Sequence, residues 1–145
     1  CRLVSNCKCS IVGSCFVSLE GEVYSCGLNK KGTIGQKEKE KFSLKRIPSL
    51  SNIKAIDCGH YHCICLDYVG NVYTFGSNKF GQLGIELIKD IPFSNVPQKL
   101  NLPPIIQISA GHDFNMCLSD NRNVYSFGNG YSGQLGLSFN QVIDT

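Results

Sequence analysis

Sulfur and imidazole groups are concentrated in one short stretch, CGHYHCIC. The stretch contains five side chains of the kind that bind metal ions: Cys58, His60, His62, Cys63 and Cys65. Structural zinc requires ligand pairs that are separated by a turn and converge from two elements. The residue types therefore raise the possibility of metal binding, and the spacing alone does not establish it.

A second stretch matches a nucleotide-binding pattern. GNGYSG, residues 128–133, satisfies G-x-G-x-x-G. A dinucleotide fingerprint needs a following helix whose N-terminus meets the pyrophosphate, whereas GQLGLSF, which follows, is not helical. The segment from Gly76 to Gly81 also fails as a phosphate loop, because Gln82 and Leu83 stand where Lys and Ser or Thr would be needed. We expect no cofactor.

Two histidines follow glycines in similar contexts, His60 in Gly-His-Tyr-His and His112 in Gly-His-Asp-Phe. Nucleophilic catalysis would need a Ser or Cys and an orienting carboxylate around one of them. The sequence singles out no such set, and the histidine recurs instead of occurring once. We therefore predict no catalytic residues and a chain that is not an enzyme.

An internal repeat organises the chain. GNVYTFGSNKFGQLG (residues 70–84) is preceded by GEVYSCGLNKKGTIG (21–35) and followed by RNVYSFGNGYSGQLG (122–136). The shared Val-Tyr pairs are separated by 72 − 23 = 49 and 124 − 72 = 52 residues. A period near fifty indicates one supersecondary unit that is repeated.

Each repeat contains short apolar runs bounded by Gly, Asp or Asn, a pattern typical of strands joined by tight turns. Alternation along one such strand places Tyr73 and Phe75 on one face and Val72 on the other. A strand that is apolar on both faces must be covered on both sides. The connecting stretches 36–52 and 85–104 carry all five prolines, so we expect at most a short edge strand in each.

The repeat also accounts for the cysteines. Eight of the nine align with Ala, Ile, Leu, Phe, Met or another Cys in other repeats, and only Cys63 aligns with polar residues, Ser14 and Asn115. Free cysteine behaves as a small buried hydrophobe. We therefore expect no metal site. The odd count favours unpaired thiols and a reducing, intracellular location.

A four-stranded unit that recurs every fifty residues with glycines and aromatics is typical of β-propeller blades. GNVYTFGSNKFGQLG and NVYSFGNGYSGQLG closely resemble the regulator-of-chromosome-condensation repeat. The resemblance covers essentially the whole chain and implies an all-β fold with four-stranded antiparallel blades, about three of the family's seven. We assign repeats to residues 1–49, 50–101 and 102–145 of one propeller. The first repeat departs from the family pattern at Ser10, Gly13 and Cys26.

The resemblance also suggests where a partner binds. The family member that exchanges nucleotide on a small GTPase uses Asp and His residues of the glycine-histidine loops. The first repeat offers only Ile11, Val12 and Gly13 there. We predict that the loops form a partner-binding rim on one side of the ring. The matching positions are His60, Tyr61, His62, His112, Asp113 and Phe114.

We predict a non-catalytic platform for protein–protein interaction. Guanine-nucleotide exchange on a small GTPase is the first alternative, although the exchanging member also uses a β-hairpin wedge that no connection here is long enough to supply. The second alternative is a targeting propeller of a larger enzyme, such as a ubiquitin ligase or kinase.

Charge, hydropathy and the first residue bear on nucleic acid, membrane spans and the extent of the chain. Lysines cluster between residues 30 and 46, but Glu38 and Glu40 interrupt them and the net charge is only +3, so nucleic acid is not the expected partner. No apolar run is long enough for a membrane span. Because the first residue is Cys1, we expect an excerpt, with the remaining blades supplied by the same longer chain.

Overall fold

The computed structural model describes residues 4–37, 40–85 and 92–136, and its regular structure over these ranges is almost entirely β. Strands of the first repeat are β1 (Val4–Cys9), β2 (Gly13–Ser18), β3 (Val23–Leu28) and β4 (Glu40–Arg46), with a 3-10 turn η1 at Lys30–Gly32. Those of the second are β5 (Ile53–Cys58), β6 (His62–Asp67), β7 (Val72–Ser77) and β8 (Phe93–Lys99). Those of the third are β9 (Ile105–Ala110), β10 (Phe114–Ser119) and β11 (Val124–Gly128).

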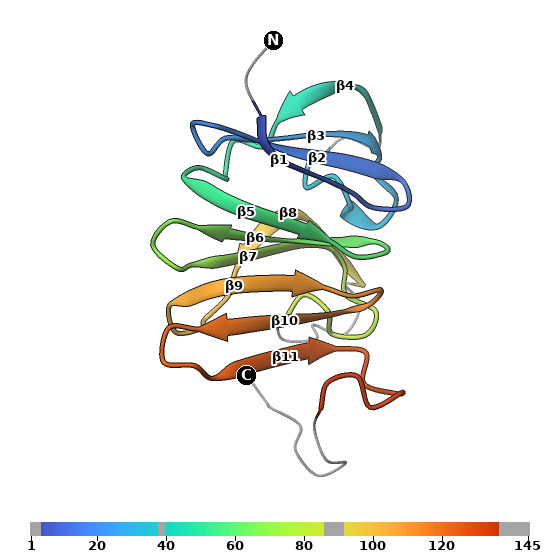
Figure 1. The fold of residues 1–145 in the computed structure, drawn as a ribbon. Coiled ribbons are helices and arrows are strands. Elements are labelled where there is room, and N and C mark those ends of the chain that lie inside the picture. Colours follow the sequence, from blue (N-terminus) through green and yellow to red (C-terminus); the bar gives the residue numbers. More distant parts are fainter. Residues whose placement is uncertain (1–3, 38–39, 86–91, 137–145) are drawn as a thin grey trace.

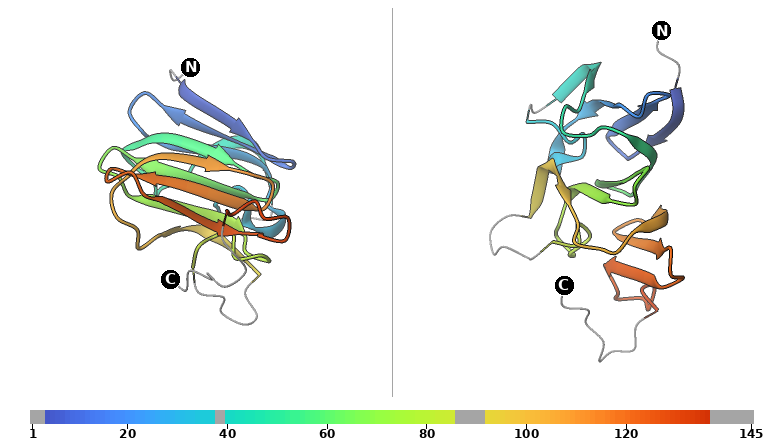
Figure 2. Two further views of the ribbon diagram at one scale, coloured as in Figure 1. Left: turned by 60° about the horizontal axis from the view of Figure 1, so that its bottom comes forward. Right: turned by 90° about the vertical axis from the view of Figure 1, so that its left-hand side faces the viewer.

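The strands form three antiparallel sheets, ordered β1-β2-β3-β4, β5-β6-β7-β8 and β9-β10-β11. The sheets stack in sequence order (Figure 1), and β1 contacts β5, which contacts β9. The outer strands β4 and β8 lie on the opposite side of the stack from β1, β5 and β9 (Figure 2). The all-β prediction with four-stranded units is confirmed. Residues beyond Gly136, where a fourth strand of the third sheet would begin, lie outside the described residues.

Backbone hydrogen bonds join each sheet to the next through a glycine turn. The amide of Ile53 donates to the carbonyl of Gly21 at 3.0 Å, and the amide of Ile105 donates to that of Gly70 at 3.0 Å. Both glycines have positive φ, 76° and 94°, which side chains rarely adopt. The turn between β2 and β3 therefore fixes where β5 begins, and the turn between β6 and β7 does the same for β9.

The outer strands are longer than the short edge strands expected from the prolines. β4 and β8 each have seven residues, and β8 contains Pro97. Thr74 pairs with Gln98, and Gly76 pairs with Ser94, so β8 bulges between these two pairs. Pro97 lies inside the bulge, where no regular ladder requires its missing N–H.

Two apolar interfaces hold the stack together. Phe75 of β7 is fully buried against the first sheet and Val72 is buried toward the third, as the alternation predicted, while Tyr73 is half-buried. The first interface contains Cys15, Val17, Val23, Ile47, Leu50, Ile53, Ile56, Cys63, Cys65 and Phe75. The second contains Ile64, Leu66, Val72, Leu100, Ile105 and Cys117. None of the described segments forms a helix long and apolar enough to cross a membrane.

The cysteines follow the repeat only in part. Cys15 and Cys117 are buried as expected, and burial raises the pKa of each thiol to about 12. Cys7, in contrast, is exposed. It aligns with Ile56, whose face the first sheet covers, whereas no described sheet covers the same face of β1.

A second difference is a disulfide between Cys58 and Cys63. Cys58 and Cys63 belong to the same repeat, so their equivalents in the other repeats give no sign that the two are neighbours across a pair of strands. In the structure the two residues are register partners on β5 and β6, with Cα atoms 4.1 Å apart. The odd count favoured unpaired thiols, and these two cysteines are instead paired.

Candidate functional site

The turns that open each repeat gather along one edge of the stack, on the right in Figure 1. The amide of Ile11 donates to the carbonyl of His60 at 3.3 Å, and the amide of His60 donates to the carbonyl of His112 at 2.8 Å. Three turns from separate sheets are therefore hydrogen-bonded in a row. We call the surface formed by Ile11, His60, Tyr61, His112 and Asp113 the loop rim.

Aromatic rings continue this row at the side-chain level. The ring centroid of His60 lies 4.0 Å from that of His112 and 4.5 Å from that of Tyr61. The Nζ atom of Lys31, in the glycine-rich corner of the first sheet, lies 4.1 Å from the centroid of Tyr61. Such contacts between a cation and a ring stabilise both groups modestly. The rim thus presents flat rings and one ammonium group in fixed relative positions.

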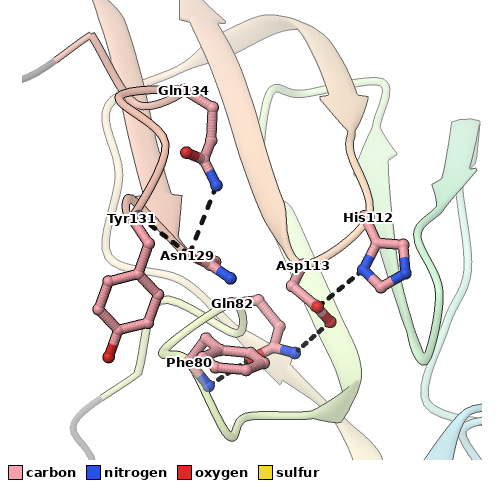
Figure 3. A network of polar contacts seen from close by, with 7 residues as sticks. All are labelled: Phe80, Gln82, His112, Asp113, Asn129, Tyr131 and Gln134. Atoms are coloured by element: carbon pink, nitrogen blue, oxygen red, sulfur yellow. Dashed lines mark hydrogen bonds and ion pairs between the residues drawn. The ribbon is translucent and has the colours of Figure 1, made fainter.

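Asp113 is held from two sides (Figure 3). Its Oδ2 lies 2.7 Å from Nδ1 of His112, and its Oδ1 accepts a hydrogen bond from Nε2 of Gln82 at 3.3 Å. Gln82 is fully buried, and its Oε1 accepts from the amide of Phe80 at 2.9 Å. The carboxylate is only 14% exposed, while the His112 side chain is 67% exposed. The direction of the carboxylate is therefore set by the corner of the second sheet.

His62 does not lie on the rim, in contrast to its predicted position. Its side chain is 0% exposed, and its Nε2 lies 3.0 Å from Oδ1 of Asn115 on β10. Burial lowers the pKa of the imidazole, so the ring stays neutral near pH 7. The Asn115 amide in turn donates to the carbonyl of Gln82 at 2.7 Å. His62 therefore joins the second and third sheets below the rim.

The ring of Phe114 lies against Gly111 of its own turn. A Cβ atom placed on Gly111 would lie 2.1 Å from Cε1 of Phe114, so the ring occupies that space. Phe114 is half-buried. The structure thus brings four of the predicted residues together on the rim: His60, Tyr61, His112 and Asp113.

Two residues that help to build the site were missed from the sequence. Gln82 recurs as Gln134 in the third GQLG corner, and a recurring polar residue among glycines could have suggested a hydrogen-bonding role. Lys31 has no repeated counterpart, since Phe80 and Ser132 occupy its position. Only the folded arrangement reveals that it covers Tyr61.

The glycine-rich corners extend the rim beside Asp113. Phe80 and Tyr131 meet edge-to-face with centroids 6.4 Å apart, and Tyr131 is 88% exposed. Figure 3 shows both rings on the same side of Asp113. Exposed aromatic side chains of this kind are common anchors at protein interfaces.

The rim combines an imidazole–carboxylate pair with flat rings. The His112–Asp113 pair resembles the imidazole–carboxylate pair of hydrolases, but the ring that faces His112 is that of His60 and not a Ser or Cys side chain. A group suited to a metal ion lies elsewhere, between the first two sheets: Cys15, Cys58 and Cys63.

Two models of one repeat family match this chain. A model of the regulator of chromosome condensation (RCC1) repeat matches residues 20–66 and 69–118, and a second model of that repeat matches 53–82 and 105–134. Each match of the first model starts between the second and third strands of one sheet and ends within the next sheet.

Curated relatives are similar to this chain over only part of their own length. Protein RCC2 homolog of Danio rerio is 36% identical over 137 residues, which cover 89% of this chain and 28% of that protein. The probable E3 ubiquitin-protein ligase HERC6 of Homo sapiens is 36% identical over 121 residues, which cover 79% of this chain and 12% of that protein. The chain thus spans less than a third of these relatives.

A solved structure has the same architecture. Yeast RCC1 (Prp20), determined bound to Kap60, superposes with a TM-score of 0.85 at 25% identity, covering 99% of this chain and 33% of that one. Together with the family-model matches, this shows that the chain belongs to the regulator of chromosome condensation (RCC1) repeat family.

Proposed function

We propose that the chain is part of a non-catalytic platform for protein–protein interaction and that a protein partner binds the loop rim. The observation that carries this proposal is the position of Asp113, whose carboxylate is held by His112 and Gln82 beside a row of rings. A fixed carboxylate can engage a Lys or Arg of a partner without first losing side-chain freedom.

The rigidity of the rim supports the same proposal. Its turns are hydrogen-bonded to one another, and His60 packs against both Tyr61 and His112. Tyr and His have few rotatable bonds, so they provide contact area at a small entropic cost. Loops carried on a rigid scaffold commonly bind partners.

The test compares two sets of variants of the complete protein. We expect the combined variant His60→Ala, Tyr61→Ala, His112→Ala and Asp113→Ala to lose partner capture in a pull-down assay while its circular dichroism spectrum stays unchanged. Tyr68→Ala with Val69→Ala is the matched control, since both side chains are exposed in the turn between β6 and β7, on the opposite edge. Unchanged capture by the rim variant, or loss in the control alone, would move the partner site off the rim.

Guanine-nucleotide exchange is the second candidate. Prp20p of Saccharomyces cerevisiae, whose structure was reported with its binding to Gsp1p and histones, has the same fold with a TM-score of 0.83. A nucleotide-release assay on candidate small GTPases separates exchange from binding. Release that the complete protein accelerates and that Asp113→Ala abolishes would favour exchange, whereas capture without faster release would favour the platform.

A targeting role in a larger enzyme is the third candidate, and the similarity to HERC6 motivates it. In that case the partner captured by the rim would be modified by another domain of the same protein. Modification that is lost in the rim variant but retained by the control would support this role.

We still expect nucleic acid not to be the partner. Lys31 covers Tyr61, and Arg46 pairs with Glu22 at 3.1 Å, so these charges are partly neutralised or used within the fold.

A further inference from the structure

Three sulfur atoms meet between the first and second sheets. Cys15 comes from β2, Cys58 from the end of β5 and Cys63 from β6. Their Sγ atoms all lie within 4.8 Å of one another, and those of Cys15 and Cys63 are 4.0 Å apart. Cys15 and Cys63 are buried and Cys58 is half-buried. We call these residues the inter-sheet thiol cluster.

The repeat does not explain this convergence. The equivalent place between the second and third sheets is occupied by Ile64, Ala110 and Asn115, which align with Cys15, Cys58 and Cys63. An interface of this kind can therefore pack without any sulfur. The three cysteines occupy three different repeat positions and come together at this one interface of the described stack.

We propose that the reduced chain binds one thiophilic d10 cation, with Zn²⁺ as the reference case, through the inter-sheet thiol cluster. Zinc–sulfur bonds measure about 2.3 Å, so thiolates at the corners of a tetrahedron around the ion are separated by about 3.8 Å, and three thiolates leave the fourth corner to water. The 4.0 Å between the Sγ atoms of Cys15 and Cys63 is close to this separation. Cys58 is fixed by its pairing with Cys63 across the β5–β6 ladder.

The donor set favours soft metal ions. Thiolates select Zn²⁺, Cd²⁺ or Cu⁺ over Mg²⁺ and Ca²⁺, which prefer oxygen. The neighbouring imidazole of His62 is turned to the other face of the second sheet, where it meets Asn115. The site therefore offers three sulfur ligands, and the partial exposure of Cys58 leaves an approach for the ion.

The disulfide and the metal are alternative states of the cluster. In the structure Cys58 and Cys63 are bonded to each other, which uses two of the three ligands. A dithiol reductant would cleave this bond, giving two thiols here and a disulfide on the reductant. The cation then displaces the thiol protons as it binds, because the thiolate is the ligand. Binding would join the first two sheets through Cys15.

Cadmium titration of the complete protein tests the proposal. The protein is reduced with a phosphine, freed of reductant, and titrated with Cd²⁺ while thiolate-to-metal charge-transfer absorbance is recorded. Metal content after gel filtration gives the stoichiometry. We expect Cys15→Ile, Cys58→Ala and Cys63→Asn each to remove one equivalent of bound Cd²⁺ relative to wild type.

These substitutions are chosen from the second interface of the same chain, where Ile64, Ala110 and Asn115 stand, so the fold has a precedent for each of them. Cys117→Ala, which removes a buried thiol outside the cluster, is the matched control and should leave binding unchanged. The oxidised protein should bind one equivalent fewer than the reduced one. Retention of the full stoichiometry by folded Cys15→Ile, or no Cd²⁺ bound by the reduced wild type, would overturn the proposal.

Discussion

The imidazole of His62 fills the space that a side chain at Gly59 would occupy. A Cβ atom on Gly59 would lie 2.3 Å from Cε1 of His62. Phe114 has the same relationship to Gly111, at 2.1 Å. In the first sheet, Ser10 aligns with Gly59 and Gly13 aligns with His62. A side chain in place of the turn glycine is therefore accompanied by a glycine in place of the ring. Glycine and ring are thus paired features of the turn.

This pairing predicts unequal costs for two similar substitutions. A Cβ atom on Gly59 would also lie 2.4 Å from the carbonyl oxygen of Gly111, whereas on Gly111 its three nearest atoms all belong to the Phe114 ring. A half-buried ring can turn, but a backbone carbonyl in a hydrogen-bonded turn cannot. We expect Gly59→Ala to cost about 1–3 kcal/mol, as overpacking does, and Gly111→Ala to cost less, by denaturant unfolding of the complete protein.

The first sheet suggests the control for this prediction. Adding Phe114→Gly to Gly111→Ser recreates the Ser10–Gly13 combination and should recover part of the stability lost in Gly111→Ser. Equal losses in Gly59→Ala and Gly111→Ala, with no recovery in the double variant, would show that the rings do not determine the glycine requirement.

Two phenylalanines, one on an inner strand and one on an outer strand, differ in how far they are buried. Phe75 is fully buried at the first interface, while Phe42 on β4 is 91% exposed. Phe75→Ala should cost about 3–5 kcal/mol, and Phe42→Ala should stay within about 0.5 kcal/mol. Denaturant midpoints of both variants check the difference. Tyr73→Ala should fall between them, since Tyr73 is half-buried; similar midpoints for all three variants would contradict the assigned strand faces.

Much of the fold could be predicted because the repeat carries it. The Val-Tyr alignment places β3, β7 and β11, and period-two alternation assigns Val72 and Phe75 to opposite interfaces. The length of β8 could not be predicted. The effect of Pro97 depends on whether it meets a regular ladder or a bulge, and the pairing of β8 with β7 decides that.

The candidate site was less predictable, because its geometry depends on contacts between repeats. Alignment places His60 and His112 in equivalent turns but cannot show that their rings meet at 4.0 Å. It treats His62 as a loop residue, although that residue is the first of β6 and turns inward. Likewise, alignment explains Cys15 and Cys63 one at a time and does not show that their sulfurs approach each other.

The buried imidazole of His62 predicts a dependence of stability on pH. Burial lowers its pKa in the folded chain below the usual 6.5, so the unfolded chain binds a proton that the folded chain does not. Stability should therefore fall as pH drops below about 6.5, by at most about 1.4 kcal/mol per pH unit for this group, until the folded-state pKa is reached. His62→Phe, which copies Phe114 at the equivalent position of the third sheet, should flatten this slope. Denaturant midpoints from pH 7.5 to about 5 measure it, and parallel curves for both proteins would refute the assignment.

Gln82 offers a test of whether the direction of Asp113 matters for binding. Gln82 is fully buried, so a partner does not touch it, yet its Nε2 donates to the Asp113 carboxylate. Replacing this donor with a carboxylate, in Gln82→Glu, sets two negative groups side by side and should turn Asp113 away from its position. We expect the dissociation rate of a rim-bound partner, measured by surface plasmon resonance on the complete protein, to rise by about tenfold, equivalent to about 1.4 kcal/mol.

Gln134→Glu, in the equivalent corner of the third sheet, is the matched control. It should leave the dissociation rate unchanged, because the Nε2 atom of Gln134 contacts Asn129 instead of Asp113. If folded Gln82→Glu released the partner at the wild-type rate, the held carboxylate would not be part of the recognition.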